Sequence, residues 1–232
     1  MTMTIHGIAK MTLLDFPGHV ACTLFLPGCD FRCPFCHNFD LATGKSDEVM
    51  SEDELLAFLK GRIGLLDGVA VTGGEPLLHR DLPDLLSKIR ELGYMTKIDT
   101  NGYHPEALSG IISSGLCDYV AMDVKNSPAK YAGTCGVDSV DLSRIEKSIE
   151  ILKCAPIDSE FRTTVTAELH AAEDIEEIGK MVRGAKRYYL QAFVDRDSVP
   201  FEGFSAPPRE TMAEYLAIAR KYVPEAALRG ID

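Results

Sequence analysis

Apolar residues recur along this chain in two alternating patterns. Short runs of apolar and β-branched residues are each followed by a longer stretch in which apolar residues recur every three or four positions. The first pattern is typical of a buried strand and the second of an amphipathic helix. Six such pairs follow one another. We expect the strands at residues 20–26, 68–72, 95–99, 119–123, 161–166 and 188–193.

Signals for helix ends lie between these strands. Ser51–Glu54 has the pattern of a capping box, Asp141 is a favoured N-cap residue, and Pro105 suits a first helical turn. Gly93 and Gly115 each end an apolar period, as glycines commonly do after a helix. The expected helices begin near residues 52, 82, 105, 142, 175 and 212, and a polar loop with three prolines covers 195–208.

This alternation predicts an α/β fold with parallel strands joined by right-handed crossovers. Residues 1–19 are expected to form a lead-in strand and turn. Residues 20–193 would form the core, and residues 194–232 a loop and helix of the same single domain. Six units are too few for a closed eight-fold barrel. The pattern alone does not separate an open partial barrel from a doubly wound sheet.

Composition narrows the class of protein. Of 232 residues, 46% are hydrophobic and 25% are charged, as in ordinary globular domains. The formal net charge of −11 disfavours nucleic-acid binding, which needs a basic surface. There is no apolar run of eighteen residues, and His6 and Lys10 interrupt the N-terminal apolar stretch where a signal peptide would be expected. We therefore expect a cytoplasmic protein with no membrane or nucleic-acid partner.

Three cysteines cluster in the loop that follows the first strand. Cys29, Cys33 and Cys36 have the spacing C-x3-C-x2-C, so their thiolates must share a metal or repel one another. A structural zinc site and an all-protein four-iron cluster each take four ligands. Three cysteines without an obvious fourth leave one iron open. The alternative is a zinc knuckle completed by His37 or a distant cysteine. The other thiols are expected to be ordinary free cysteines: Cys22, Cys117, Cys135 and Cys154.

Polar motifs also follow or end the other strands. In barrel enzymes the carboxyl ends of the strands carry the active site, so we expect these residues to meet at one opening. In the order of the strands they are Gly73, Gly74 and Glu75; Asp99 and Thr100; Asp123 and Lys125; Arg162 and Thr164; and Gln191.

The cysteine loop, with Phe35 before its last cysteine, resembles that of the radical S-adenosylmethionine (SAM) enzymes. The stretches Thr-Gly-Gly-Glu-Pro, Asp-Thr-Asn-Gly and Met-Asp-Val-Lys are similar to those of the activating enzymes of glycyl-radical enzymes. The resemblance covers essentially the whole chain. It implies a partial, TIM-like (β/α)6 barrel in which Cys29, Cys33 and Cys36 hold a [4Fe–4S] cluster. The amino and carboxylate groups of SAM would chelate the fourth iron.

The resemblance also implies roles for the strand-end residues. Gly73, Gly74 and Glu75 would bind the SAM amino group, because a turn carbonyl and a carboxylate accept hydrogen bonds from an ammonium. Lys125 would pair with the SAM carboxylate. The alternatives are a tight turn with a solvated Glu75 and a buried Asp–Lys pair that only orders the opening.

The remaining implied contacts concern the rest of SAM and a cation. Asp99, Thr100 and Asp123 would supply oxygen ligands to a monovalent cation near the SAM carboxylate. Phe35 would pack on adenine, with simple loop packing as the alternative. Arg162 and Thr164 would face the ribose and methionyl parts, unless Arg162 is a structural ion-pair partner. Gln191 stands where related pyruvate formate-lyase activators carry a histidine that helps hold SAM.

The implied reaction is one-electron cleavage of SAM to methionine and a 5′-deoxyadenosyl radical, which takes a hydrogen from a glycine Cα of a partner protein. Within the family, the chain most resembles the activators of anaerobic ribonucleoside-triphosphate reductase. Asp15–Gly18 reads Asp-Phe-Pro-Gly, not the Asp-Gly-Pro-Gly of pyruvate formate-lyase activators. A flavodoxin or ferredoxin is the implied electron donor.

Three alternatives stay open at the level of sequence. The chain could act on another glycyl-radical enzyme of the pyruvate formate-lyase type. It could act on a small molecule, as a 7-deazaguanine synthase does. A non-catalytic zinc or electron-transfer protein is a third possibility, of a different class.

Overall fold

The computed structural model describes residues 3–230 of the chain. Its main sheet has eight strands in the order β10-β9-β8-β7-β6-β5-β3-β2. All neighbours pair in parallel except β2, which is antiparallel to β3. The strands of this sheet are β2 (Gly7–Thr12), β3 (Ala21–Leu26), β5 (Gly68–Gly73), β6 (Met95–Thr100), β7 (Tyr119–Asp123), β8 (Asp158–Val165), β9 (Tyr188–Ala192) and β10 (Ala226–Arg229).

Helices connect the parallel strands, and a small second sheet pairs β1 (Thr4–Ile5) with β4 (Met50–Ser51). The side chain of Ser51 caps the helix that follows in a full capping box with Glu54, and Asp141 accepts a hydrogen bond from the Ser143 amide. Both N-caps are therefore confirmed. The helices are α1 (Phe39–Ala42), α2 (Glu52–Lys60), η1 (Pro76–Leu78), α3 (Leu82–Glu91), α4 (Pro105–Ser113), α5 (Tyr131–Thr134), α6 (Leu142–Cys154), α7 (Ala172–Met181) and α8 (Arg209–Ala219).

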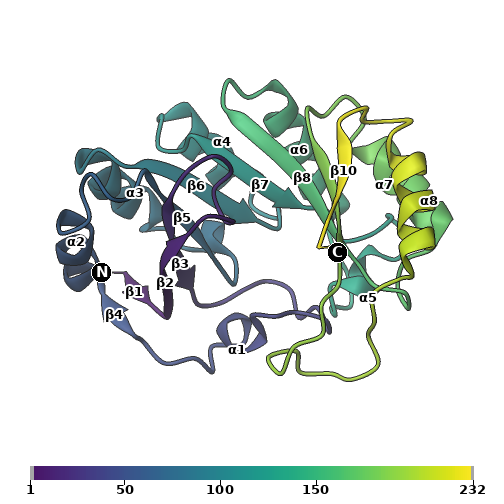
Figure 1. The fold of residues 1–232 in the computed structure, drawn as a ribbon, viewed down its shortest axis with the longest axis horizontal. Helices are drawn as coiled ribbons and strands as arrows, with labels where there is room; N and C mark the ends of the chain where they lie inside the picture. Colours follow the sequence, from purple (N-terminus) through teal and green to yellow (C-terminus); the bar gives the residue numbers. More distant parts are fainter. Residues whose placement is uncertain (1–2, 231–232) are drawn as a thin grey trace.

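The sheet is curved, and its two end strands, β2 and β10, do not pair with each other (Figure 1). The longer helices follow its outer side from α2 to α8, whereas α1 and the loop 194–208 lie along the lower edge of the view. Apolar strand residues such as Val69, Val71 and Ile98 are fully buried in the core. This confirms the predicted α/β fold with parallel strands in a single, open, barrel-like domain.

Two strands of the main sheet differ from the prediction, and the small sheet of β1 and β4 was not predicted. β8 begins at Asp158, three residues before the expected start, and includes the polar residues Ser159 and Glu160. β10 was not predicted, so the segment 194–232 contributes a strand in addition to the expected loop and helix. Its sequence, Ala-Ala-Leu-Arg, has low β-propensity, and it becomes a strand by pairing with Tyr188–Gln191 of β9.

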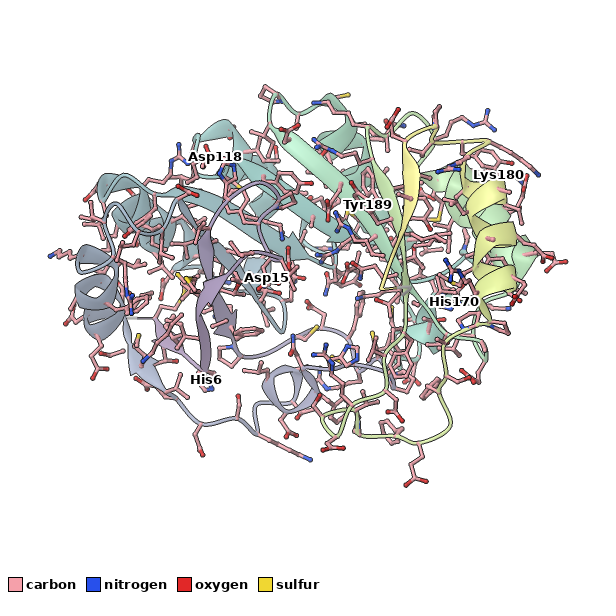
Figure 2. All side chains as sticks on the ribbon, in the orientation of Figure 1. His6, Asp15, Asp118, His170, Lys180 and Tyr189 are labelled. Carbon is pink, nitrogen blue, oxygen red and sulfur yellow. The ribbon has the colours of Figure 1, made fainter. Side chains whose placement is uncertain are left out.

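A small apolar cluster lies at the amino ends of the strands. At the amino ends of the strands, Phe16 is buried against Ala21 and Tyr119, and a Cβ on Gly68 would come within 2.8 Å of its ring. Further along the strands, Tyr189 of β9 lies between β8 and β10, while Lys180 lies on the outer helix α7 (Figure 2).

Within residues 3–230, none of the helices combines the length and the apolar character that crossing a membrane would require.

Candidate active site

A cavity of about 250 Å³, open to solvent on one side, lies at the carboxyl ends of the strands. Its size is close to the lower end of the range for small-molecule sites. Segments from β3 to β9 contribute to its wall, as the sequence predicted. The lining residues are Cys29, Phe31, Cys33, Phe35, Cys36, His37, Asn38, Ala42, Thr72, Gly73, Gly74, Asp99, Thr100, Asn101, Asp123, Lys125, Arg162, Thr164 and Gln191.

The cysteine loop is fixed to the strand beside it by backbone contacts. Gly28 leaves β3 with φ of +80°, a conformation that favours glycine, and its amide donates to the Leu41 carbonyl at 2.8 Å. Its own carbonyl accepts from the Glu75 amide at 2.7 Å. A Cβ on Gly74 would lie only 1.9 Å from the same Gly28 oxygen. The approach of the two loops therefore requires glycine at position 74.

All three clustered thiols are free and line the cavity, which is the arrangement that a cluster bound by three cysteines requires. The Phe31 amide and the Asn101 side-chain amide donate to Cys29 Sγ, at 3.4 and 3.7 Å. Burial raises the pKa of Cys29 to about 12 and also raises that of Cys36. Within residues 3–230, no three Cys, His, Asp or Glu side chains are grouped to hold a single metal ion.

Cys135 lies next to Cys33, which the sequence did not indicate. The Arg32 amide donates to the Cys135 carbonyl at 2.8 Å, and the Cys135 side chain is fully buried. Its thiol is a hydrogen-bond partner of Cys33, and this contact lowers the pKa of Cys33 below that of an ordinary thiol. Burial raises the pKa of Cys135. Position 135 has no local motif, so the expectation of an unremarkable free thiol was incomplete.

Glu75 lies behind the wall of the cavity and does not line it. The carboxylate is fully buried and accepts three hydrogen bonds, from the Leu77 amide at 3.0 Å, the Thr100 hydroxyl at 2.8 Å and the Asn101 amide at 2.7 Å. Burial raises the pKa of Glu75 to about 7, against the opposing effect of these donors. In this geometry Glu75 orders the turn after β6, and Gly73 and Gly74 supply the cavity surface expected to receive an ammonium.

Asp123, Lys125 and Arg162 form an ion-pair cluster at the ends of β7 and β8. Lys125 Nζ and Arg162 Nε lie 2.9 Å from the two different carboxylate oxygens of Asp123. Burial favours protonation of Asp123, but the charges of Arg162 and Lys125 outweigh it and hold the Asp123 pKa below its usual range. For Lys125, burial is outweighed by Asp123 and Cys33, so its pKa is raised. The lysine is therefore a permanent cation on the cavity wall.

Asp99 belongs to the same network through Arg162, whose guanidinium lies 3.5 Å away, and through an ion pair with the buried Lys97. Two carboxylates, Asp99 and Asp123, thus face three cationic side chains. The monovalent cation expected at Asp99, Thr100 and Asp123 stays a prediction, and these ion pairs weigh against it because the local positive charge already exceeds the negative.

Aromatic rings pack around the cysteine loop. Phe35 is almost fully buried and packs edge-to-face against Phe193 and Phe204, with ring centroids 6.4 and 6.1 Å apart. His37 stacks on Phe193 and its Nε2 lies 2.6 Å from the Val194 carbonyl oxygen. The cysteine loop is thereby joined to the segment after β9. Phe35 still reaches the cavity, so its expected contact with adenine remains a prediction alongside its packing role.

Several lining residues were not predicted as site residues. Asn38 donates to the Gly73 carbonyl at 3.1 Å, which links the cysteine loop to the glycine turn. Asn101 directly follows Thr100, and His37 and Asn38 directly follow Cys36. Their positions beside predicted site residues could therefore have indicated them. Phe31, Ala42 and Thr72 have no such signal beyond their position near a strand end.

Comparison with protein families agrees with this geometry. The model of the radical SAM superfamily matches residues 23–185, which include the cysteine loop and most of the other lining residues. A protein of Methanocaldococcus jannaschii named "putative glycyl-radical enzyme activating enzyme" is 31% identical to the chain over 243 aligned residues, covering 100% of this chain and 98% of the relative.

Other relatives match over shorter regions. The pyruvate formate-lyase-activating enzyme of Clostridium pasteurianum is 35% identical over 53% of this chain and 52% of its own length. The anaerobic ribonucleoside-triphosphate reductase-activating protein of Salmonella typhi is 30% identical over 39% of this chain and 60% of its own length. Each of these two matches thus covers only part of this chain and part of the relative.

Among solved structures, a radical SAM methyltransferase from Sphaerobacter thermophilus superposes with a TM-score of 0.72. The superposition covers 94% of this chain and 68% of the methyltransferase, at 15% identity. At that identity the likeness concerns the fold alone, and it confirms the partial barrel.

Proposed function

The chain belongs to the radical SAM superfamily, and from this premise we propose that it is an activating enzyme that generates a glycyl radical on a partner protein. One observation carries the proposal: three free thiols and a wall of glycine and cationic side chains share one cavity at the strand ends. The full-length similarity to a protein named as a glycyl-radical enzyme activating enzyme supports the same branch of the family.

Members of the family use a [4Fe–4S] cluster and SAM, and the residues of this cavity suit both groups. We assign Cys29, Cys33 and Cys36 as the cluster ligands. When bound, the reduced cluster supplies the one electron that divides SAM into methionine and a 5′-deoxyadenosyl radical. The Phe31 and Asn101 amides already donate to Cys29 Sγ, and donors of this kind stabilise a thiolate.

The other wall of the cavity would orient SAM. Carbonyl groups at Gly73 and Gly74 can accept hydrogen bonds from its ammonium, because no side chain prevents a close approach. Lys125 offers a fixed positive charge to its carboxylate, and Asp123 and Arg162 hold that lysine in place. Thr164 and Gln191 lie further along the wall, where they can contact the ribose and methionyl parts.

A radical that abstracts an unactivated hydrogen must be kept from water and held against its target. The rings of Phe31 and Phe35 line the cavity and provide its apolar side, and Phe193 and Phe204 pack behind Phe35. The substrate hydrogen would come from a glycine Cα of the partner. The products would be 5′-deoxyadenosine and a glycyl radical, so that one electron and one hydrogen atom are accounted for.

We propose anaerobic ribonucleoside-triphosphate reductase as the partner, a flavodoxin or ferredoxin as the electron donor, and the cytoplasm as the location. Similarity to the Salmonella typhi activating protein supports the partner. Phe16 weighs against pyruvate formate-lyase as the partner, because the activators of that enzyme carry glycine at this position. In this chain the Phe16 ring is buried at the amino ends of the strands, against Ala21 and Gly68. Similarity to the Clostridium pasteurianum enzyme favours pyruvate formate-lyase as the competing partner.

The test is anaerobic reconstitution with iron and sulfide, followed by two measurements. Chromatography of 5′-deoxyadenosine after reduction reports SAM cleavage, and electron paramagnetic resonance reports a glycyl radical on mixing with each candidate partner. We expect both with the reductase. Cys33→Ala should abolish cleavage and leave the fold largely intact, whereas Cys154→Ala, which removes an exposed thiol, should not change cleavage.

The possible results separate the parts of the proposal. A radical on pyruvate formate-lyase alone would replace the partner but keep the activity. SAM cleavage without a radical on either protein would favour a different substrate. Zinc bound at the three thiols with no response to SAM would exclude the enzyme altogether.

A further inference from the structure

Lys125 lies just beyond the end of β7, where the chain leaves the sheet. Backbone pairing with β8 continues through the Val124 amide, which donates to the Arg162 carbonyl at 2.8 Å. The charged end of Lys125 is paired with Asp123, but this aspartate lies only two residues away on the same segment. The position of the lysine relative to the rest of the cavity therefore depends on the contacts that hold its backbone.

The loop after β8 holds this backbone by two reciprocal hydrogen bonds. His170 Nε2 lies 3.0 Å from the Lys125 carbonyl oxygen, and the Asn126 side chain donates to the Leu169 carbonyl, also at 3.0 Å. Each segment thus receives a side-chain donor from the other on a backbone carbonyl. Asn126 is fully buried and only 4% of His170 is exposed, so water cannot readily replace either donor.

The His170 ring is itself fixed in place. Its Nδ1 accepts from the Thr166 amide at 3.2 Å, so Nε2 of the neutral ring carries the proton and donates to Lys125. Burial lowers the pKa of His170 and thereby favours this neutral form. The His170 amide donates to the Thr166 carbonyl at 3.2 Å, and its carbonyl accepts from the Tyr215 hydroxyl of α8 at 3.0 Å. Figure 2 shows His170 near the lower end of α8.

We propose that His170 is a positioning residue for SAM, whose ring holds the backbone of Lys125 so that the lysine meets the SAM carboxylate. This inference rests on the proposed function, in which Lys125 binds that carboxylate. The lining of the cavity described above does not include His170, so its effect on SAM passes through Lys125. Loss of the His170 donor would let the segment after β7 shift and would weaken SAM binding, while the proposed cluster ligands lie on a different loop.

The test compares two substitutions of His170 in the reconstituted and reduced protein, without a partner. The rate of 5′-deoxyadenosine formation at varied SAM concentration gives KM and kcat. His170→Asn keeps an acceptor for the Thr166 amide but is too short to reach Lys125. It should raise KM for SAM about tenfold, the scale of one lost hydrogen bond, with kcat unchanged. His170→Gln places an amide donor near the former Nε2 and should keep KM within about twofold of the wild-type value.

A double-mutant cycle separates positioning from a general structural role. In a Lys125→Met background, His170→Asn should cause no further rise in KM, because the group that it positions is absent. His6→Asn is the matched control, since His6 Nδ1 lies 2.9 Å from the Ser46 carbonyl oxygen and His6 is on the opposite side of the view in Figure 2. This substitution should leave KM unchanged.

An unchanged KM in His170→Asn, or an equal rise in His170→Asn and His170→Gln, would overturn the inference. The same further rise in the Lys125→Met background would overturn it too. Loss of bound iron in both His170 variants would show that the histidine supports the cluster loop and would also overturn it. A wild-type protein that takes up a cluster but cleaves no SAM would overturn the proposed function as well. Cleavage without a radical on any partner would overturn the proposed function alone.

Discussion

Glu75 shows how a side chain can be essential to a site without lining it. Three donors from two segments converge on its carboxylate, and the Thr100 oxygen also accepts from the Gly102 amide. The sequence places Glu75 in a ligand-binding motif, but it does not reveal that donors twenty-five residues away would occupy the carboxylate. A motif gives the residue's location, whereas the hydrogen-bond partners determine the direction in which it points.

We expect Glu75→Gln to lower the free energy of unfolding by about 1–3 kcal/mol, because the amide nitrogen would face a donor and leave a buried group unsatisfied. Urea unfolding of the cluster-free protein measures this. Glu146→Gln, an exposed substitution on α6, is the matched control and should have little effect. Equal stability of the two variants would mean that the three hydrogen bonds contribute nothing.

The same substitution has a pH signature. Since the folded-state pKa of Glu75 is raised to about 7, the folded protein binds this proton more tightly than the unfolded chain does. The contribution of Glu75 to stability is therefore complete below about pH 4.5 and declines as the pH rises to 7. The difference between wild type and Glu75→Gln should be larger at pH 5 than at pH 7.5. A difference that grows with pH would contradict this.

At the scale of elements, the sequence predicted the helices and strands that depend on interactions between residues close together in the chain. The β-branched core strands and the Ser51 and Asp141 caps formed as expected, because propensity and capping act within a few residues. β10 and the contact of Cys135 with Cys33 could not be predicted. The first depends on a pairing partner thirty-eight residues away, and the second on how the loop after β7 packs on the loop after β3.

The close contact between the cysteine loop and the glycine turn after β5 can be tested by substitution. Gly74→Ala would place a methyl group 1.9 Å from the Gly28 carbonyl oxygen, so the loop must move. We expect a loss of about 1–3 kcal/mol in stability and poor cluster uptake, measured by urea unfolding and by iron content after reconstitution.

Gly110→Ala is the control for this substitution. A Cβ at this position in α4 meets nothing within 4 Å, so alanine should stabilise the protein by about 0.5–1 kcal/mol. A Gly74→Ala protein that takes up iron as well as Gly110→Ala would show that the close approach is not required.

β10 is tied to β8 by a buried ion pair. Both oxygens of Glu160, whose side chain is 1% exposed, accept from Arg229, at 2.6 and 2.8 Å. Arg229→Met should cost about 3 kcal/mol, because it leaves a buried carboxylate with Tyr119 as its remaining hydrogen-bond donor. Arg187→Met, whose partner Asp158 is 59% exposed, should cost less than about 1 kcal/mol in the same unfolding experiment.

A lower pH should reduce the difference in the free energy of unfolding between the wild type and Arg229→Met. Burial raises the pKa of Glu160, but Arg229 and Tyr119 outweigh it and lower the pKa overall. The stability from this pair is therefore present above the unfolded-state pKa of about 4.3 and is lost as the pH falls below it. Urea unfolding at pH 3.5 and pH 7 should show the wild type and Arg229→Met closer at the lower pH. A constant gap would mean that Glu160 is not charged in the fold.

At the scale of the whole molecule, one cavity unites groups from more than two thirds of the chain, from Cys29 to Gln191. Ligands that bind there should therefore stabilise the entire domain. For the cluster-loaded protein, SAM at one hundred times its dissociation constant should add about 2.7 kcal/mol. At about 2–4 °C per kcal/mol for a domain of this size, the melting temperature should rise by about 5–10 °C.

Anaerobic thermal denaturation with and without SAM measures that shift. Lys125→Met should reduce it at the same SAM concentration, because the variant removes the cation expected to meet the SAM carboxylate. Lys147→Met, which removes an exposed lysine paired with the exposed Glu106, should retain it. An equal shift in both variants would remove Lys125 from the SAM contacts.

The contact between Gly28 and Gly74 has a practical consequence for protein engineering. The eleven residues from Gly28 to Asn38 contain all three clustered thiols, which makes them an attractive module to graft onto another scaffold. Such a graft would fail on a recipient strand that carries any side chain where Gly74 lies, since the donor loop rests directly on that bare backbone. The transplantable unit is therefore the loop together with the neighbouring glycine turn.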